Sequence, residues 1–190
     1  MPAKDLHELI AWLKANPDKA SAGVTAVGPQ LIATRFQRET GTHFALVPYR
    51  GTAPALQDLV AGQIDLFLET PAQLPLVHGG SLKAYAVTSD TRLAQARDIP
   101  TFAEMRLPAL SWSAWYGFFA PRNTPKDIIS KLNGAAVEAL ADPAVQSRLV
   151  DLGLEIFPRE RQTPEALGAL VKTDAEKWWP IIKESGIKLD

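Results

Sequence analysis

Short apolar segments alternate with segments that carry helix signals along most of the chain. We predict strands at the apolar runs 20–24, 44–47, 64–68, 82–88, 112–120 and 154–157. Parallel strands need crossover connections of about a dozen residues, and these are usually helical. The alternation therefore predicts an α/β fold with a mainly parallel sheet flanked by helices.

Capping residues and apolar periodicity place the helices. Asp5 is a helix-capping residue, and the apolar residues after it share one helical face: Leu6, Leu9, Ile10 and Leu13. Pro29 suits the first turn of the next helix, which Gly41 ends. The remaining helices are predicted at 54–62, 71–77, 124–141, 142–153 and 163–184. Thr101 and Glu104 have the spacing of a capping box within a long loop.

Charge and composition exclude several classes of protein. The 20 Lys and Arg residues are mixed with 21 Asp and Glu residues, so no basic block offers a footprint for nucleic acid or an anionic membrane. The absence of cysteine excludes disulfides, thiolate catalysis and cysteine-ligated zinc. No apolar run approaches the ~20 residues of a spanning helix. The first residues lack the apolar region of a signal peptide.

The loop from Gly23 to Gly28 has the glycine spacing of a phosphate loop. Pro29 and Gln30 stand where that motif requires lysine followed by serine or threonine, so a nucleotide site is not predicted. The loop still leads from a strand into a helix, whose free N–H groups and positive end suit a carboxylate. The alternative is an ordinary strand-to-helix turn.

No arrangement of residues predicts catalysis or a metal site. His7, His43 and His78 lie in separate elements without ligand spacing, and no serine lies in a Gly-x-Ser-x-Gly elbow. Asp58, Asp65 and Glu69 are spread over a helix and the end of a strand. Trp112, Trp115 and Tyr116 are interpreted as core packing of a strand, with a ligand platform as the alternative. We predict no catalytic residue, metal or cofactor.

One long segment resembles a known family. Val47–Leu66 reads VPYRGTAPALQDLVAGQIDL, which is similar to the pattern V-P-Y-[KR]-G-x-x-P-A-L-x-D-L-x-x-G-x-[IV]-D of the Bug family. These proteins are the extracytoplasmic solute receptors of tripartite tricarboxylate transporters. Three further blocks agree in order: 82–104, 115–133, and 149–153 with Trp178, Gly186 and Ile187.

The resemblance implies a fold of the type II periplasmic-binding-protein kind, made of two α/β lobes. It places residues 1–115 in lobe two, near complete, and residues 116–190 in the returning C-terminal part of lobe one, with the rest of lobe one absent. The chain is thus expected to be an N-terminally truncated, periplasmic receptor. It is expected to bind a small carboxylate or dicarboxylate and to deliver it to a membrane permease. Two alternatives stay open: a small α/β enzyme domain of hydrolase type, and a truncated remnant that binds nothing.

The ligand is expected at two loops that each follow a strand and open a helix, namely 21–30 and 49–53. Ligands of open α/β sheets bind at the carboxyl ends of the strands, so both loops should face one crevice. Thr25 and Tyr49 would add hydroxyl donors. The candidate binding residues are Ser21, Gly23, Thr25, Ala26, Gln30, Tyr49, Gly51, Thr52, Ala53 and Glu69.

Two departures from the family pattern concern these loops. Gln30 stands where the family usually has histidine, and Leu68 stands where an aspartate is common, with Glu69 beside it. The missing part of lobe one has a second consequence. The apolar faces of the helices after Thr124 and Thr163 would lose part of their sheet, so we expect self-association through uncovered apolar surface.

Overall fold

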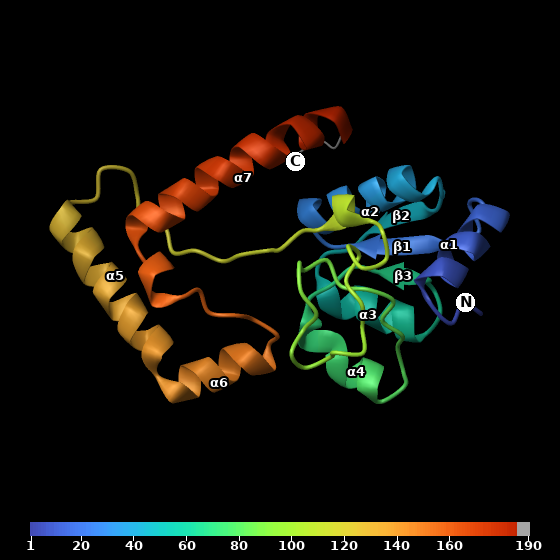
Figure 1. Cartoon of the computed structure of the whole chain (residues 1–190), viewed down its shortest axis with the longest axis horizontal. Helices are drawn as coiled ribbons and strands as arrows, with labels where there is room; N and C mark the ends of the chain where they lie inside the picture. The colour runs from blue at the N-terminus through green and yellow to red at the C-terminus, as the bar shows by residue number, and fades with distance from the viewer. Residues whose placement is uncertain (186–190) are drawn as a thin grey trace. The chain divides into compact units, whose positions relative to one another are not determined.

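The computed structural model describes residues 1–185, which form two compact units (Figure 1). The first unit spans Met1–Ser113, and the second begins at Ala114. The family match at Gly186 and Ile187 lies outside the described residues.

The first unit is built on a three-stranded sheet in the order β2-β1-β3, with every strand parallel to its neighbour. The predicted α/β class with a parallel sheet is therefore confirmed. Its elements in chain order are α1 (Leu6–Ala15), β1 (Ser21–Val24), α2 (Val27–Thr40), β2 (Ala45–Pro48), α3 (Thr52–Val60), β3 (Leu66–Phe67), a 3₁₀ turn (Pro71–Gln73), α4 (Leu74–His78) and a second 3₁₀ turn (Pro108–Leu110).

The first helix shows how directly the sequence sets these elements. The Asp5 side chain accepts a hydrogen bond from the Glu8 N–H at 2.9 Å, as the capping prediction required. Leu6, Leu9 and Leu13 are buried along one face of α1. They join a core that also holds the central strand β1 and a cluster of three rings: Phe36, Phe44 and Phe102.

Two predicted strands of the first unit differ from the structure. The strand predicted at 64–68 is reduced to Leu66–Phe67. The strand predicted at 82–88 is wrong, since that segment makes only an isolated parallel bridge between Val87 and Thr101. The capping box beside this bridge is confirmed. The Thr101 N–H donates to the Glu104 carboxylate at 2.7 Å, and the Glu104 N–H donates to the Thr101 hydroxyl at 3.1 Å.

The strands predicted at 112–120 and 154–157 are also wrong, because neither segment has a regular structure. A strand is stable only beside another strand that pairs its N–H and C=O groups, and no described residue after Thr101 belongs to a strand or a β-bridge. Nor is 112–120 the buried core it was predicted to be. The exposed fractions are 73% for Tyr116, 88% for Phe118 and 69% for Phe119.

The second unit is helical over its described residues. It contains α5 (Lys126–Ala141), α6 (Pro143–Asp151), a 3₁₀ turn (Arg159–Arg161) and α7 (Pro164–Ser185), so the three predicted helices are confirmed. The Asp142 carboxylate caps α6 by accepting from the Ala144 N–H at 2.7 Å. The Trp115 indole N–H donates to the Asp174 carboxylate and ties the incoming segment to α7. No helix within residues 1–185 combines the length and the apolar character needed to cross a membrane.

Candidate functional site

The three strands of the first unit end at one edge of the sheet, where three loops follow them. We call residues 25–26, 49–51 and 68–70 the loop edge, since they come directly after β1, β2 and β3. The chain moves from β1 to β2 on one side and then returns to β3 on the other side of β1. With right-handed crossovers, this reversal places α2 and α3 on opposite faces of the sheet (Figure 1). Such a switch point opens a crevice at the carboxyl ends of the strands.

The helix that follows the central strand begins without a cap. Ala26 is the residue before α2 and has an extended backbone, with φ −158° and ψ 169°, but its methyl group cannot accept a hydrogen bond. The first bond of the helix runs from the Gln30 N–H to the Ala26 carbonyl at 3.2 Å. The N–H groups of Val27 and Gly28 precede that bond and have no hydrogen-bond partner within the helix. Together with the helix dipole, they form a partial positive charge suited to an anion.

A tryptophan holds the start of α2 in place. A Cβ on Gly28 would lie 2.9 Å from Cζ2 of Trp112, so only glycine permits the indole to pack this closely. The backbone N–H of Trp112 donates to the Thr88 carbonyl at 2.8 Å, and this bond anchors the residue within the first unit. No pattern in the sequence indicates this contact, because residue 28 and residue 112 are far apart in the chain.

The helix that follows β2 begins differently. Gly51 precedes α3 with φ 114°, a conformation that disfavours residues with a Cβ, and it provides no side-chain cap. The Thr52 hydroxyl donates to Oε2 of Glu69 at 2.7 Å, and Oε1 of Glu69 accepts from the Thr70 N–H at 2.8 Å. A carboxylate of the chain itself therefore stands beside the start of α3.

Tyr49 lies at the loop edge, but its hydroxyl is already occupied. The hydroxyl donates to Oδ2 of Asp58 on α3 at 2.7 Å. This hydrogen bond, with smaller contributions from burial and from the negative charge of Asp58, raises the pKa of Tyr49. The ring packs over the central strand, where a Cβ on Gly23 would lie 3.5 Å from Cδ2 of Tyr49. Tyr49 thus packs across the sheet and has no proton free for a ligand.

The structure separates the other candidate residues. Ser21 begins β1, at the end of the strand opposite the loop edge, where its N–H donates to Oδ2 of Asp65 at 3.0 Å. Gly23 is buried within β1, and a Cβ there would lie 2.8 Å from Cδ1 of Ile64. Gln30 is half-buried beyond the start of α2, and Ala53 is exposed in the first turn of α3. The residues that the loop edge and the adjoining helix starts bring together are Thr25, Ala26, Tyr49, Gly51, Thr52 and Glu69.

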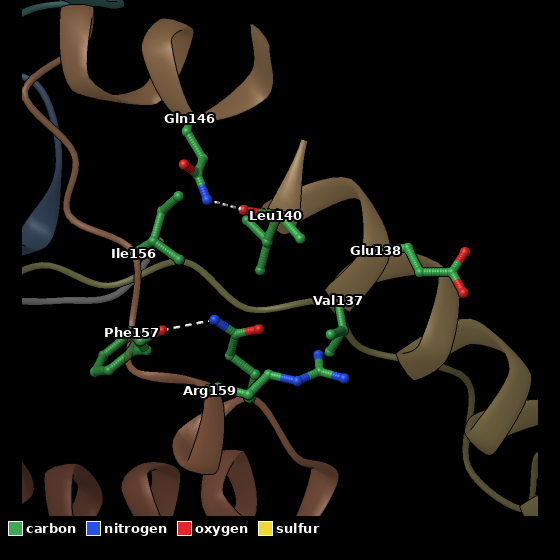
Figure 2. A pocket seen from close by; sticks show the side chains of 9 residues that line it. Val137, Glu138, Leu140, Gln146, Ile156, Phe157 and Arg159 are labelled. Atoms are coloured by element: carbon green, nitrogen blue, oxygen red, sulfur yellow. Dashed lines mark hydrogen bonds between the residues drawn. The ribbon is translucent and has the colours of Figure 1, made fainter. Parts of the chain in front are cut away.

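A separate pocket lies in the second unit (Figure 2). It has a volume of about 560 Å³ and lies among the end of α5, the start of α6 and residues 156–162. Two of its polar side chains bond to carbonyls in the pocket lining, since the Gln146 amide donates to the Leu140 carbonyl and the Gln162 amide donates to the Phe157 carbonyl. None of the residues singled out in the sequence lines it. Within residues 1–185, no group of His, Asp and Glu side chains is arranged to hold a metal ion.

Comparison with known proteins identifies close relatives. A family model described as "Tripartite tricarboxylate transporter family receptor" matches residues 1–187, which confirms the resemblance stated from the sequence. A protein of Agrobacterium vitis, encoded in the TAR-I ttuE-ttuC' intergenic region, is 34% identical over 96% of this chain and 54% of its own length. The chain thus spans about half the length of this curated relative.

Two solved structures have the same fold as this chain. A structure described as a periplasmic transporter is 38% identical, with a TM-score of 0.89 over 100% of this chain and 63% of that chain. MatC from Rhodopseudomonas palustris, solved with bound malate, is 33% identical, with a TM-score of 0.87 over 95% of this chain and 63% of that chain. These matches confirm the predicted periplasmic-binding-protein type of fold.

We expect the folded protein to hold the Tyr49 phenol protonated above its ordinary pKa of about 10, because the proton is donated to Asp58. Asp58→Asn removes the carboxylate charge and should lower the pKa of Tyr49 toward that ordinary value. Since the folded-state pKa is the higher one, the stabilisation is fully present below about pH 10 and is lost as the pH rises through the folded-state pKa.

The measurement is an NMR titration of the tyrosine ring carbons in wild type and in Asp58→Asn. Tyr85 serves as the internal control, because burial alone raises its pKa and the substitution should leave it unchanged. A Tyr49 pKa that is the same in both proteins would contradict the assigned hydrogen bond.

Proposed function

The chain belongs to the tripartite tricarboxylate transporter receptor family, and we propose that it captures a small carboxylate and delivers it to a membrane permease of that transporter class. The resemblance to MatC, which was solved with malate, supports a carboxylate as the ligand. Residues 1–115 would form one ligand-binding lobe, and residues 116–190 would belong to the other. A location in the periplasm accords with the structure described as a periplasmic transporter.

The observation that carries this proposal is the uncapped start of α2 at the carboxyl end of the central strand. Serine, threonine, aspartate and asparagine are the usual residues at such a position, because their side chains accept the first N–H groups of the helix. Alanine at position 26 leaves those groups to an external acceptor. A ligand carboxylate could accept both N–H bonds and lie at the positive end of the helix dipole. The Thr25 hydroxyl lies next to them in the same loop.

The enzyme alternative has less support in the arrangement of side chains. A hydrolytic site needs a nucleophile and a base within hydrogen-bonding reach. Among residues 1–185, no serine hydroxyl makes a hydrogen bond with a histidine, and Ser21 lies away from the loop edge. The family and its solved members point to solute binding. We therefore propose that the chain binds its ligand without turning it over.

The proposal predicts opposite effects of one substitution on stability and on binding. Ala26→Asp places a carboxylate where the ligand carboxylate would accept from α2. Capping should raise the free energy of unfolding by about 0.5–2 kcal/mol. The same change should weaken malate binding at least about tenfold, because each lost hydrogen bond to a charged group is worth about 1.5–3 kcal/mol. Urea unfolding and an NMR titration with malate measure the two quantities.

Ala26→Asn is the matched control, since it adds a cap of the same shape without charge. It should stabilise α2 and weaken malate binding less than Ala26→Asp does. Malate affinity that is unchanged in both variants would show that α2 does not bind the carboxylate and would remove the main support for this function.

We also propose that the second unit associates with a second copy of the chain. Tyr116, Phe118 and Phe119 are largely exposed on its incoming segment, and α5 and α7 add further exposed apolar side chains: Ile128, Leu132, Val171 and Trp179. Large exposed apolar patches are rare on soluble monomers and favour association.

Sedimentation velocity should give a mass that rises above that of the monomer as the protein concentration increases. Replacing Phe118 and Phe119 together by serine should lower the measured mass toward that of the monomer. A wild-type protein that stays monomeric at every concentration would contradict the proposal.

A further inference from the structure

We propose that residues 114–120 of the second unit, which we call the aromatic segment, form a β-strand that pairs antiparallel with the same residues of a second copy of this chain. This inference rests on the self-association proposed above and names the contact that would carry it. It does not depend on where a carboxylate binds, so it can fail while the receptor function stands.

The aromatic segment lies on α7 as a strand lies on a helix that covers one face of a sheet. It runs as a nearly straight trace beside α7 (Figure 1). The Trp115 indole N–H donates to the Asp174 carboxylate of α7, and a Cβ on Gly117 would lie 3.0 Å from Cδ1 of Leu167 on the same helix. Residues 115 and 117 therefore face α7.

The residues that alternate with these two are open to solvent. Tyr116 is 73% exposed and Phe118 is 88% exposed. Side chains that point alternately to two sides are the mark of a β-strand. The aromatic segment thus has one side covered by a helix and one side uncovered, although no strand lies beside it.

The backbone of the aromatic segment lacks the partners that a strand needs. In the part of the chain that the structure describes, no N–H or C=O group of residues 114–120 makes a hydrogen bond. Free strand edges are templates for pairing with another chain, and proteins usually protect them with charged residues or proline. Residues 114–120 contain neither. The segment is therefore suited to pair with a further strand.

Symmetry sets the register of a pair made by two copies. A two-fold axis normal to the paired strands makes them antiparallel and keeps α7 of both copies on the same face. Residues on the same face must then lie opposite each other, so the register is centred on a residue. A centre at Gly117 pairs all of residues 114–120 and ends before Pro121, which has no N–H. Tyr116 of each copy then lies opposite Phe118 of the other, an aromatic pair of the kind that stabilises sheets.

The charges around the aromatic segment are compatible with a second copy. Residues 107–121 are uncharged, and Arg122 is the first charged residue after them. In the proposed register, Arg122 of one copy lies opposite residue 112 of the other. At about 3.3 Å per residue, the two Arg122 residues are about 33 Å apart along the strands, well beyond the Debye length of about 8 Å. Pairing therefore brings aromatic side chains together without opposing like charges.

The test uses the absence of cysteine from the chain, because single introduced cysteines can then report on the pairing. Ala114→Cys and Ala120→Cys are mixed and oxidised mildly. In the proposed register, residue 114 lies opposite residue 120 with Cα atoms about 5 Å apart, which is within the range of a disulfide. The mixed disulfide dimer should exceed the dimer of either variant alone several-fold, because two copies of residue 114 are about 20 Å apart.

Ala139→Cys is the matched control. It places a cysteine at an exposed alanine of α5, and with Ala120→Cys it should give only the cross-linking expected from random collision. Thermal unfolding checks that each variant is folded.

Hydrogen exchange of the wild-type chain gives a second measurement that needs no substitution. Each strand of a pair bonds along one edge, so alternate amides of residues 114–120 should become protected as the protein concentration rises. At a concentration where about nine-tenths of the chain is paired, exchange at these amides should be about tenfold slower than in the monomer. Association through α5 and α7 alone would leave them unprotected.

The outcomes separate this inference from the self-association beneath it. If the mass rises with concentration but residues 114–120 stay unprotected and the mixed disulfide is absent, the strand pairing is overturned and the self-association stands. Efficient cross-linking of each variant with itself would show parallel pairing and overturn the proposed arrangement. Equal protection in a dilute monomer would place another part of the same chain on the aromatic segment and overturn it too. A monomer at every concentration would overturn both proposals.

Discussion

The parallel pairing of β1 with strands on both sides is the constraint on which the rest of the first unit depends. It brings the ends of three strands to one edge, so loops that are separated by 16 or more residues in the chain lie at the same edge. The central strand is short and made of small residues, and Gly23 lets Ile64, Phe67 and Tyr49 pack directly on its backbone. A change of register by one residue would exchange the two faces of the strand and lose this packing.

The loop edge then differs from an ordinary set of turns in how its helices begin. Alanine before α2 leaves N–H groups without a side-chain acceptor, at a cost relative to a capping residue of about 0.5–2 kcal/mol. Local rules are most often broken at functional sites, where the broken rule serves binding. At α3, Thr52 and Glu69 supply a fixed negative charge instead. The two helices at this edge thus begin in different electrostatic surroundings.

The features of the first unit that depend on local interactions were predicted correctly from the sequence. The Asp5 cap, the leucine face of α1, the end of α2 at Gly41 and the capping box at Thr101 all depend on residues within a few positions of each other. The strand predicted at 112–120 failed because an apolar run does not reveal whether another strand is present to pair with it. The sequence pattern also does not show which side chains contact each other in the folded chain. Nothing in the pattern around Tyr49 indicates that Asp58 takes its proton, or that Trp112 covers Gly28.

The central claim is that a carboxylate binds at the carboxyl edge of this sheet through backbone N–H groups. A ¹H–¹⁵N NMR titration of the chain with a small carboxylate tests it residue by residue. We predict that the amide signals of Val27 and Gly28 move most, with smaller changes at Thr52. The amides of Ser21 and Asp65, at the opposite end of the strands, should stay in place. Shifts centred on Ser21 and Asp65, or on the pocket residues of the second unit, would contradict the account.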